Sequence, residues 1–149
     1  MNDVPESRPS VEPPMDANAA PYPALRWEVY GLFSSIDAMD VAAVVGRFTD
    51  DAVVRFANQE RVVGKAGIQQ VVETLFSGIR GLSHAVTGVW LGSWEEGEVV
   101  SVESEVTYTR LDGVQLAPLP VTTTLRMAEG LVKDFRVFMD PSPLFATET

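Results

Sequence analysis

The chain has 149 residues, 46% of them hydrophobic and 21% charged, which suits one globular domain with a core of its own. Its formal net charge of -10 argues against nucleic acids and anionic membrane surfaces as partners, because both require a basic surface. The sequence contains no cysteine, so disulfides, thiolate metal sites and a cysteine nucleophile are excluded.

The amino-terminal segment differs from the rest in composition. Residues 1–22 are rich in proline and small polar residues, and they carry too little apolar surface to offset the entropy of ordering. We therefore predict a disordered tail over residues 1–22 and one folded domain over residues 23–146. The start of the chain lacks the apolar core of a signal peptide, and no segment approaches transmembrane length. A cytoplasmic location is the resulting expectation.

Three segments have helical periodicity. Apolar residues recur at helical spacing from Pro23 to Ile36, which predicts a first amphipathic helix. Asp40 stands where an N-cap is needed for a second, shorter helix over Val41–Phe48. A third helix is expected over Ile68–Ile79, whose apolar residues again form one stripe.

The remaining segments have strand character. Strands are expected at Ala52–Phe56, Arg61–Val63 and Ser83–Trp94, and as three long strands within Glu98–Asp140. This last segment alternates apolar and polar residues and is rich in valine and threonine. It turns at Gly113 and Gly130, where glycine favours a tight reversal.

The first long strand has two different faces. Val100 and Val102 fall on one face, and Glu103 and Glu105 fall on the other. The polar face either contacts water or lines a cavity whose chemistry uses carboxylates, and the sequence leaves this open. Helices gathered on one face of an antiparallel sheet define an α+β domain, and strong curvature of that sheet favours an apolar cavity.

Two motifs resemble the signature of the nuclear transport factor 2-like superfamily, namely Phe48–Val54 and the following Gly64–Ile68. The closing segments Glu129–Val132 and Arg136–Asp140 strengthen the resemblance, which covers Ala24–Phe145. This superfamily includes SnoaL-like polyketide cyclases, ketosteroid isomerases and limonene-epoxide hydrolases. The resemblance implies a cone-shaped, curved antiparallel sheet with three helices packed on its concave face, a cystatin-like α+β barrel. It also implies a homodimer formed through the sheet.

The resemblance carries over to individual residues. The general-base Asp of the isomerases would fall at Phe56 and their oxyanion-hole acid near Thr123, so both carboxyls of ketosteroid isomerisation are absent. In the epoxide hydrolases, the first Asp of the catalytic set would fall at Glu105 and the closing Asp at Asp140. The resemblance therefore implies Asp140 and Glu105 as an acid/base pair, provided that their environments separate their pKa values.

His84 is the only histidine of the chain and begins the strand before the meander. It is a candidate auxiliary base, because an imidazole titrates near neutral pH; the alternative is a strand-edge residue bonded to backbone or water. No second histidine or cysteine exists to complete a metal site, and no calcium-loop spacing or phosphate-binding glycine loop is present. We therefore expect no metal and no cofactor.

The aromatic residues are most simply core residues, but in a cone fold some of them also line the pocket. The expected ligand-binding residues are Trp27, Tyr30, Phe33, Phe56, Phe76, Trp90, Thr123 and Phe138.

Three functions follow as hypotheses. The first is a SnoaL-like protein that binds a small hydrophobic organic molecule in an apolar pocket, with cyclase- or isomerase-type acid/base chemistry. The second is an epoxide hydrolase-like enzyme that uses Glu105 and Asp140. The third is a non-catalytic dimerisation or scaffold module whose cavity is filled by its own side chains.

Overall fold

The computed structural model describes residues 27–145, and the tail predicted over residues 1–22 lies outside them. The strands are β1 (Phe48–Phe56), β2 (Val62–Val63), β3 (Gly81–Trp94), β4 (Gly97–Thr109), β5 (Leu119–Ala128) and β6 (Leu131–Phe138). The helices are α1 (Trp27–Asp37), α2 (Val41–Val45), α3 (Lys65–Ser77) and α4 (Ser142–Phe145). The predicted α+β class, with a curved sheet and few helices, is confirmed.

All six strands form one sheet in the order β2-β1-β6-β5-β4-β3. Strands β3 to β6 form the predicted antiparallel meander. Strand β1 lies beside β6 and runs parallel to it, with Val54 opposite Phe135 and Phe56 opposite Val137. The expectation of purely antiparallel pairing is therefore wrong at this edge. The first strand, β1, and the last strand, β6, are therefore neighbours in the sheet although they are far apart in sequence.

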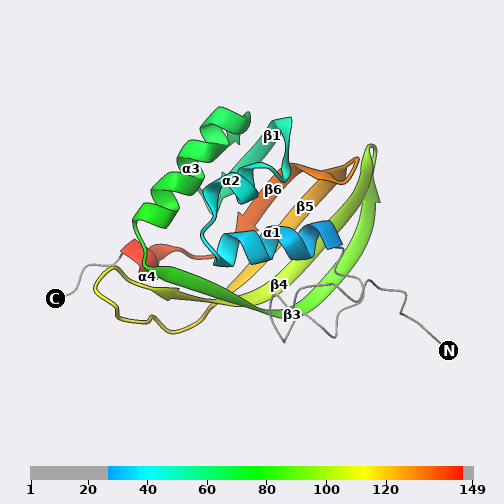
Figure 1. The fold of residues 1–149 in the computed structure, drawn as a ribbon. Coiled ribbons are helices and arrows are strands. Elements are labelled where there is room, and N and C mark those ends of the chain that lie inside the picture. Colours follow the sequence, from blue (N-terminus) through cyan, green and yellow to red (C-terminus); the bar gives the residue numbers. More distant parts are fainter. Residues whose placement is uncertain (1–26, 146–149) are drawn as a thin grey trace.

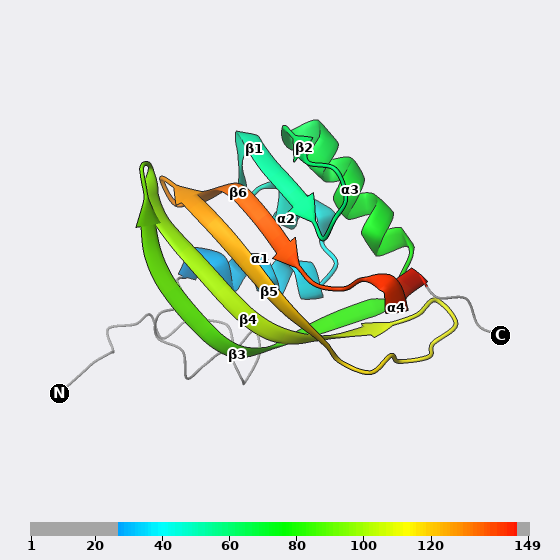
Figure 2. The same ribbon diagram turned by 180° about the vertical axis from the view of Figure 1, so that it is seen from behind.

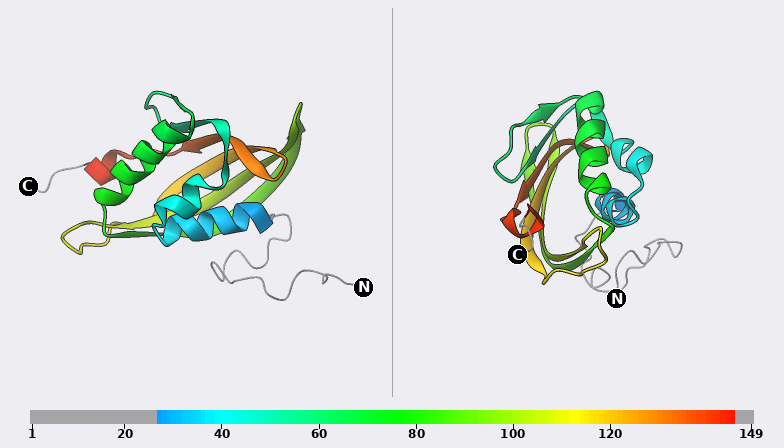
Figure 3. Two further views of the ribbon diagram at one scale, coloured as in Figure 1. Left: turned by 45° about the horizontal axis from the view of Figure 1, so that its top comes forward. Right: turned by 90° about the vertical axis from the view of Figure 1, so that its left-hand side faces the viewer.

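The helices α1, α2 and α3 lie on the concave side of the curved sheet (Figure 1). Seen from behind, the strands lie in front, and none of the described helices covers their outer face (Figure 2). Viewed end-on, the sheet bends around the helical layer (Figure 3). The short helix α4, which was not predicted, follows β6 near the end of α3 (Figure 1).

The inward face of β4 is the apolar one. Val100, Val102 and Val106 are fully buried, whereas Glu103 and Glu105 are exposed on the outer face. This answers the question that the sequence left open, because the alternation of a strand sends its glutamates outward once its valines face the core. The polar face of β4 therefore does not line the interior.

The helix boundaries differ from prediction near α2. Asp40 caps this helix as predicted, since its Oδ1 accepts a hydrogen bond from the Ala43 backbone N–H at 3.1 Å. However, α2 ends at Val45, and Phe48 begins β1 with its side chain buried. The Val132 backbone N–H donates to the Arg47 carbonyl at 2.9 Å, so pairing with β6 takes over where helical bonding stops.

Ser104 places a hydroxyl in this apolar core. It is buried on the inward face of β4, and its Oγ has no hydrogen-bond partner in the described part of the chain.

An unsatisfied buried hydroxyl costs about 1–3 kcal/mol, so Ser104→Ala should raise the free energy of unfolding by about 1 kcal/mol. Urea denaturation measures the change, provided that the dependence of the unfolding free energy on urea concentration is the same in both proteins. Ser101→Ala is the matched control, because Ser101 Oγ on the outer face shares a hydrogen bond with Thr124 Oγ1. A clear loss of stability in Ser104→Ala would mean that the hydroxyl is satisfied.

Candidate functional site

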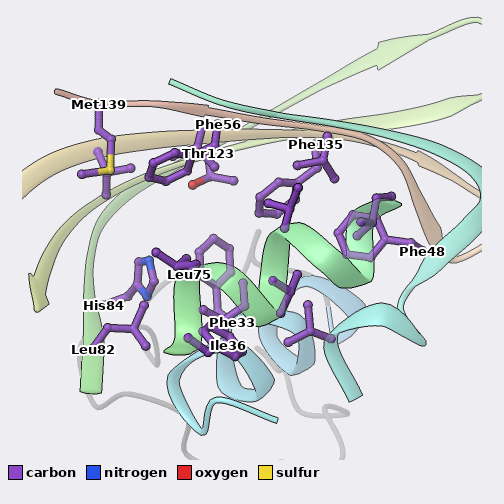
Figure 4. A pocket seen from close by; sticks show the side chains of 18 of the residues that line it. Phe33, Ile36, Phe48, Phe56, Leu75, Leu82, His84, Thr123, Phe135 and Met139 are labelled. Atoms are coloured by element: carbon purple, nitrogen blue, oxygen red, sulfur yellow. The ribbon is translucent and has the colours of Figure 1, made fainter. Parts of the chain in front are cut away.

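An apolar cavity of about 90 Å³ lies between the concave face of the sheet and helices α1 to α3. Its lining combines residues from these helices with the inward faces of the strands (Figure 4). Among the described residues that line it, the polar ones are His84 on β3, Tyr108 on β4 and Thr123 on β5. The cavity is therefore an apolar chamber with a few polar groups in its wall.

Several residues that the sequence singled out do line this cavity. They are Phe33, Phe56, Phe76, Thr123 and His84. Tyr30 is buried in the core but does not reach the cavity wall. The side chain of Trp27 lies outside the described part of the structure.

Trp90 and Phe138 contradict the pocket prediction, because both side chains are 56% exposed. The pairing of β3 with β4 slips between Val86 and Gly88, and this irregularity changes which residues of β3 point inward. Trp90 then lies over Gly88, where an added Cβ would come 2.5 Å from its ring. Phe138 follows the inward Val137 and therefore points to the opposite face.

The acid/base pair suggested by the resemblance is not a feature of the cavity. Glu105 is exposed on the outer face of β4, and Asp140 is exposed beyond the end of β6. Asp140 Oδ1 accepts a hydrogen bond from the Ser142 backbone N–H at 3.0 Å, and this bond lowers the pKa of the Asp140 carboxyl. Asp140 thus starts the turn into α4, which is the usual role of an Asp before proline.

His84 pairs with a residue that the sequence reasoning missed. Its Nδ1 lies 2.7 Å from Asp37 Oδ1, and its backbone N–H donates to Asp37 Oδ2 at 3.0 Å. The two side chains are only 9% and 18% exposed, respectively. The ring of Phe33 packs edge-on against the imidazole, with the ring centres 5.1 Å apart. His84 does lie on the edge strand β3, but its imidazole is bonded to the Asp37 side chain and not to backbone or water as that alternative expected.

A local signal for Asp37 exists in the sequence. Asp37 follows Phe33 by one helical turn, so the carboxylate shares the apolar face of α1. It is also the last residue of α1, where the negative end of the helix dipole disfavours a carboxylate. A charge in such a place needs a partner, but nothing in the sequence names His84 as that partner.

Tyr108 is the third polar residue of this group. Burial, with a further contribution from the charge of Asp37, raises the pKa of the Tyr108 hydroxyl to about 12. The hydroxyl donates a weak hydrogen bond to Met139 Sδ at 4.0 Å. At neutral pH it is therefore protonated and can donate to a ligand.

A wider groove of about 530 Å³ adjoins the cavity between α3, α4 and the end of β1. Phe56, Val71 and Leu75 line both spaces, so these three side chains separate them. Leu144 and Phe145 of α4 form part of the groove wall. The cavity would connect with the groove if the three shared side chains moved.

No group of three His, Asp or Glu side chains that could hold a metal ion occurs within residues 27–145. No helix in the same range is long and apolar enough to cross a membrane.

The curved sheet, the helices on its concave face and the apolar interior define a cone-shaped α+β protein of the nuclear transport factor 2-like type. The chain belongs to the SnoaL-like domain family, whose profile matches residues 29–135. No curated protein sequence matches it.

Three solved structures illustrate the shared fold. TerC co-crystallised with polyporic acid is 16% identical, with a TM-score of 0.65 over 79% of this chain and 92% of its own. A protein with a ketosteroid isomerase-like fold from Catenulispora acidiphila, in complex with trimethylamine, is 14% identical. Its TM-score is 0.67 over 81% of this chain and 97% of its own. A proposed polyketide cyclase from Pseudomonas putida is 14% identical, with a TM-score of 0.58 over 77% and 90%. At such identities the likeness shows the fold alone.

Proposed function

We propose that the protein binds a small hydrophobic organic molecule in the cavity between the sheet and helices α1 to α3. The observation that carries this proposal is an apolar interior chamber whose described polar lining is limited to His84, Tyr108 and Thr123. Such a lining is typical of small-molecule sites, in which a few polar groups orient an otherwise apolar ligand. The solved structures of TerC with polyporic acid and of the Catenulispora protein with trimethylamine support it as structures of the same fold.

The volume of the cavity limits the ligand. At about 90 Å³ it is smaller than an engineered cavity of about 150 Å³ that binds benzene, and smaller than the roughly 300–1,000 Å³ of drug-sized sites. A one-ring molecule would need slight expansion of the chamber. A larger one would need Phe56, Val71 and Leu75 to move, which would join the cavity to the adjoining groove.

Thr123 gives the cavity a second polar position. Its hydroxyl points into the chamber from β5, whereas His84 reaches the chamber from β3 at the edge of the same sheet, beside the end of α1 (Figure 4). Thr123 is only 3% exposed, but it lines the chamber and is within reach of a small molecule there. A ligand with one polar atom toward Thr123 and another toward His84 would hydrogen-bond to both side chains. A wholly apolar ligand would leave both of them unpaired.

A thermal-shift experiment with one-ring aromatic and alicyclic ligands tests the proposal, since a ligand that binds only the folded state raises the melting temperature. We expect a concentration-dependent rise in wild type. Val72→Phe fills the chamber from α3 and should abolish the rise, whereas Glu73→Phe places the same ring on the exposed side of α3 and should not. Asp140→Asn should also leave the rise unchanged, because Asp140 lies outside the cavity. A rise that persists in Val72→Phe would locate binding elsewhere.

A second candidate function is a non-catalytic dimerisation module. The small volume of the cavity favours it, as does the uncovered outer face of the sheet with Trp90 and Phe138 exposed. On that face Arg55 and Arg136 lie on β1 and β6, while the glutamates Glu103 and Glu105 lie on β4. A two-fold axis parallel to the strands would set the arginines of one copy against the glutamates of another, which supports a homodimer. A monomeric sedimentation coefficient together with no ligand response would rule out both candidates.

A further inference from the structure

His84, which lines the cavity, and Asp37 are joined by two hydrogen bonds. A single carboxylate holds the imidazole through Nδ1 at 2.7 Å and holds the His84 backbone N–H at 3.0 Å. The edge contact with Phe33 restrains the ring from a third direction. The orientation of the imidazole is therefore set by α1, although His84 itself lies on β3.

This pairing decides which ring nitrogen carries the proton in the neutral imidazole. A carboxylate only accepts hydrogen bonds, so Nδ1 of His84 must donate and Nε2 is left as an acceptor. Nε2 forms no hydrogen bond within residues 27–145. Because His84 lines the cavity, the wall presents an unused acceptor to whatever occupies it.

Tyr108 supplies the complementary group. Tyr108 pairs with Leu82 and His84 pairs with Val106 between β4 and β3, so Tyr108 and His84 are diagonal neighbours that both line the cavity. The Tyr108 hydroxyl is protonated at neutral pH. Its hydrogen bond to Met139 Sδ is long, so the hydroxyl can turn toward a ligand. One end of the chamber thus offers an acceptor, His84 Nε2, together with a donor, the Tyr108 hydroxyl.

The geometry points to a hydroxyl-bearing aromatic ligand of the phenol type, whose O–H donates to His84 Nε2. Asp37 is the positioning residue that holds Nε2 as the acceptor. This inference rests on the proposed binding of a small hydrophobic molecule in the same cavity. A phenolic oxygen can donate to His84 and accept from Tyr108 at once, whereas a ketone can only accept. The aromatic ring would occupy the apolar part of the chamber beside Phe33 and Leu82.

The tautomer of His84 is measurable without any ligand. Since His84 is the only histidine, the ¹⁵N-labelled protein gives one imidazole spin system. Long-range ¹H–¹⁵N spectra of the neutral ring should show the proton on Nδ1. In Asp37→Ala the preference for this tautomer should be lost. Asp40→Asn should keep it, because Asp40 caps α2 and does not contact the ring. A proton on Nε2 in the wild-type protein would overturn the inference.

The ligand class is tested with phenol and toluene, which have the same number of heavy atoms. We expect phenol to bind wild type about 5- to 150-fold more tightly than toluene, because toluene leaves the acceptor unpaired. His84→Phe keeps a ring at this position and removes the acceptor, so it should bind both ligands with similar affinity. Asp37→Ala should reduce the preference without abolishing toluene binding.

The outcomes separate the two proposals. If toluene binds and phenol shows no preference in wild type, the hydroxyl subsite is wrong while the proposed apolar binding site stands. If neither ligand binds at millimolar concentration, both proposals fail. If the phenol preference persists in His84→Phe, the hydroxyl is recognised elsewhere and the assignment to Nε2 is overturned.

Discussion

Replacing Phe33 with alanine should lower the free energy of unfolding by about 3–5 kcal/mol. Phe33 is 1% exposed on α1, contacts the His84 ring and lines the cavity. Truncation removes the favourable free energy of transferring the Phe33 ring from water into the core. It also enlarges an existing cavity, which the neighbouring side chains are too few to fill. Urea denaturation measures the loss.

The same variant should gain ligand affinity. Its enlarged chamber would accept benzene-sized molecules that the wild-type chamber of about 90 Å³ holds only after expansion. Saturating toluene should therefore restore part of the lost stability in Phe33→Ala. Phe145→Ala is the control, because Phe145 is largely exposed on α4 and its truncation should cost about 0.5 kcal/mol or less. A loss below about 1 kcal/mol in Phe33→Ala would contradict the packing described for α1.

Alkaline pH should destabilise the protein through Tyr108. Burial raises its pKa to about 12 in the folded state from the ordinary value of 10.0, so the unfolded chain releases this proton first. Stability from the neutral hydroxyl is therefore fully present below about pH 10 and is lost as the pH rises toward 12. Two pKa units correspond to roughly 2–3 kcal/mol.

The comparison of wild type with Tyr108→Phe isolates this effect. Other groups that titrate at high pH are common to both proteins and cancel in the difference between their stabilities. Urea denaturation between about pH 9 and pH 12 should show the wild type losing roughly 2–3 kcal/mol more than the variant. Parallel pH profiles of the two proteins would mean that the Tyr108 hydroxyl is hydrated and not buried against the cavity.

The sheet could be predicted because its pattern is local. Alternation along β4 assigns Val100 and Val102 to one face and Glu103 to the other, and the structure buries the valines as that pattern requires. Asp40 likewise needed only its own sequence neighbourhood to be recognised as a cap. The short helix α4 was missed because it depends on a turn that Asp140 begins with a single hydrogen bond.

The site was predicted less well, and for identifiable reasons. The irregularity in β3 after Val86 turns Trp90 to the outer face, and the sequence contains no sign of which residue is the extra one. Asp140 and Glu105 are implied by resemblance to the epoxide hydrolases, but their positions in this chain lie outside the cavity. Resemblance transfers a fold more reliably than it transfers a set of catalytic residues.

The sequence by itself determined the family, the α+β architecture and the apolar face of the sheet, because each of these depends on periodicity or on short motifs. Only the tertiary structure decided which polar groups meet inside. Asp37 and His84 are 47 residues apart, and their contact exists because the end of α1 comes to rest against β3. A contact of that range depends on how helix and sheet pack, and no local pattern encodes it.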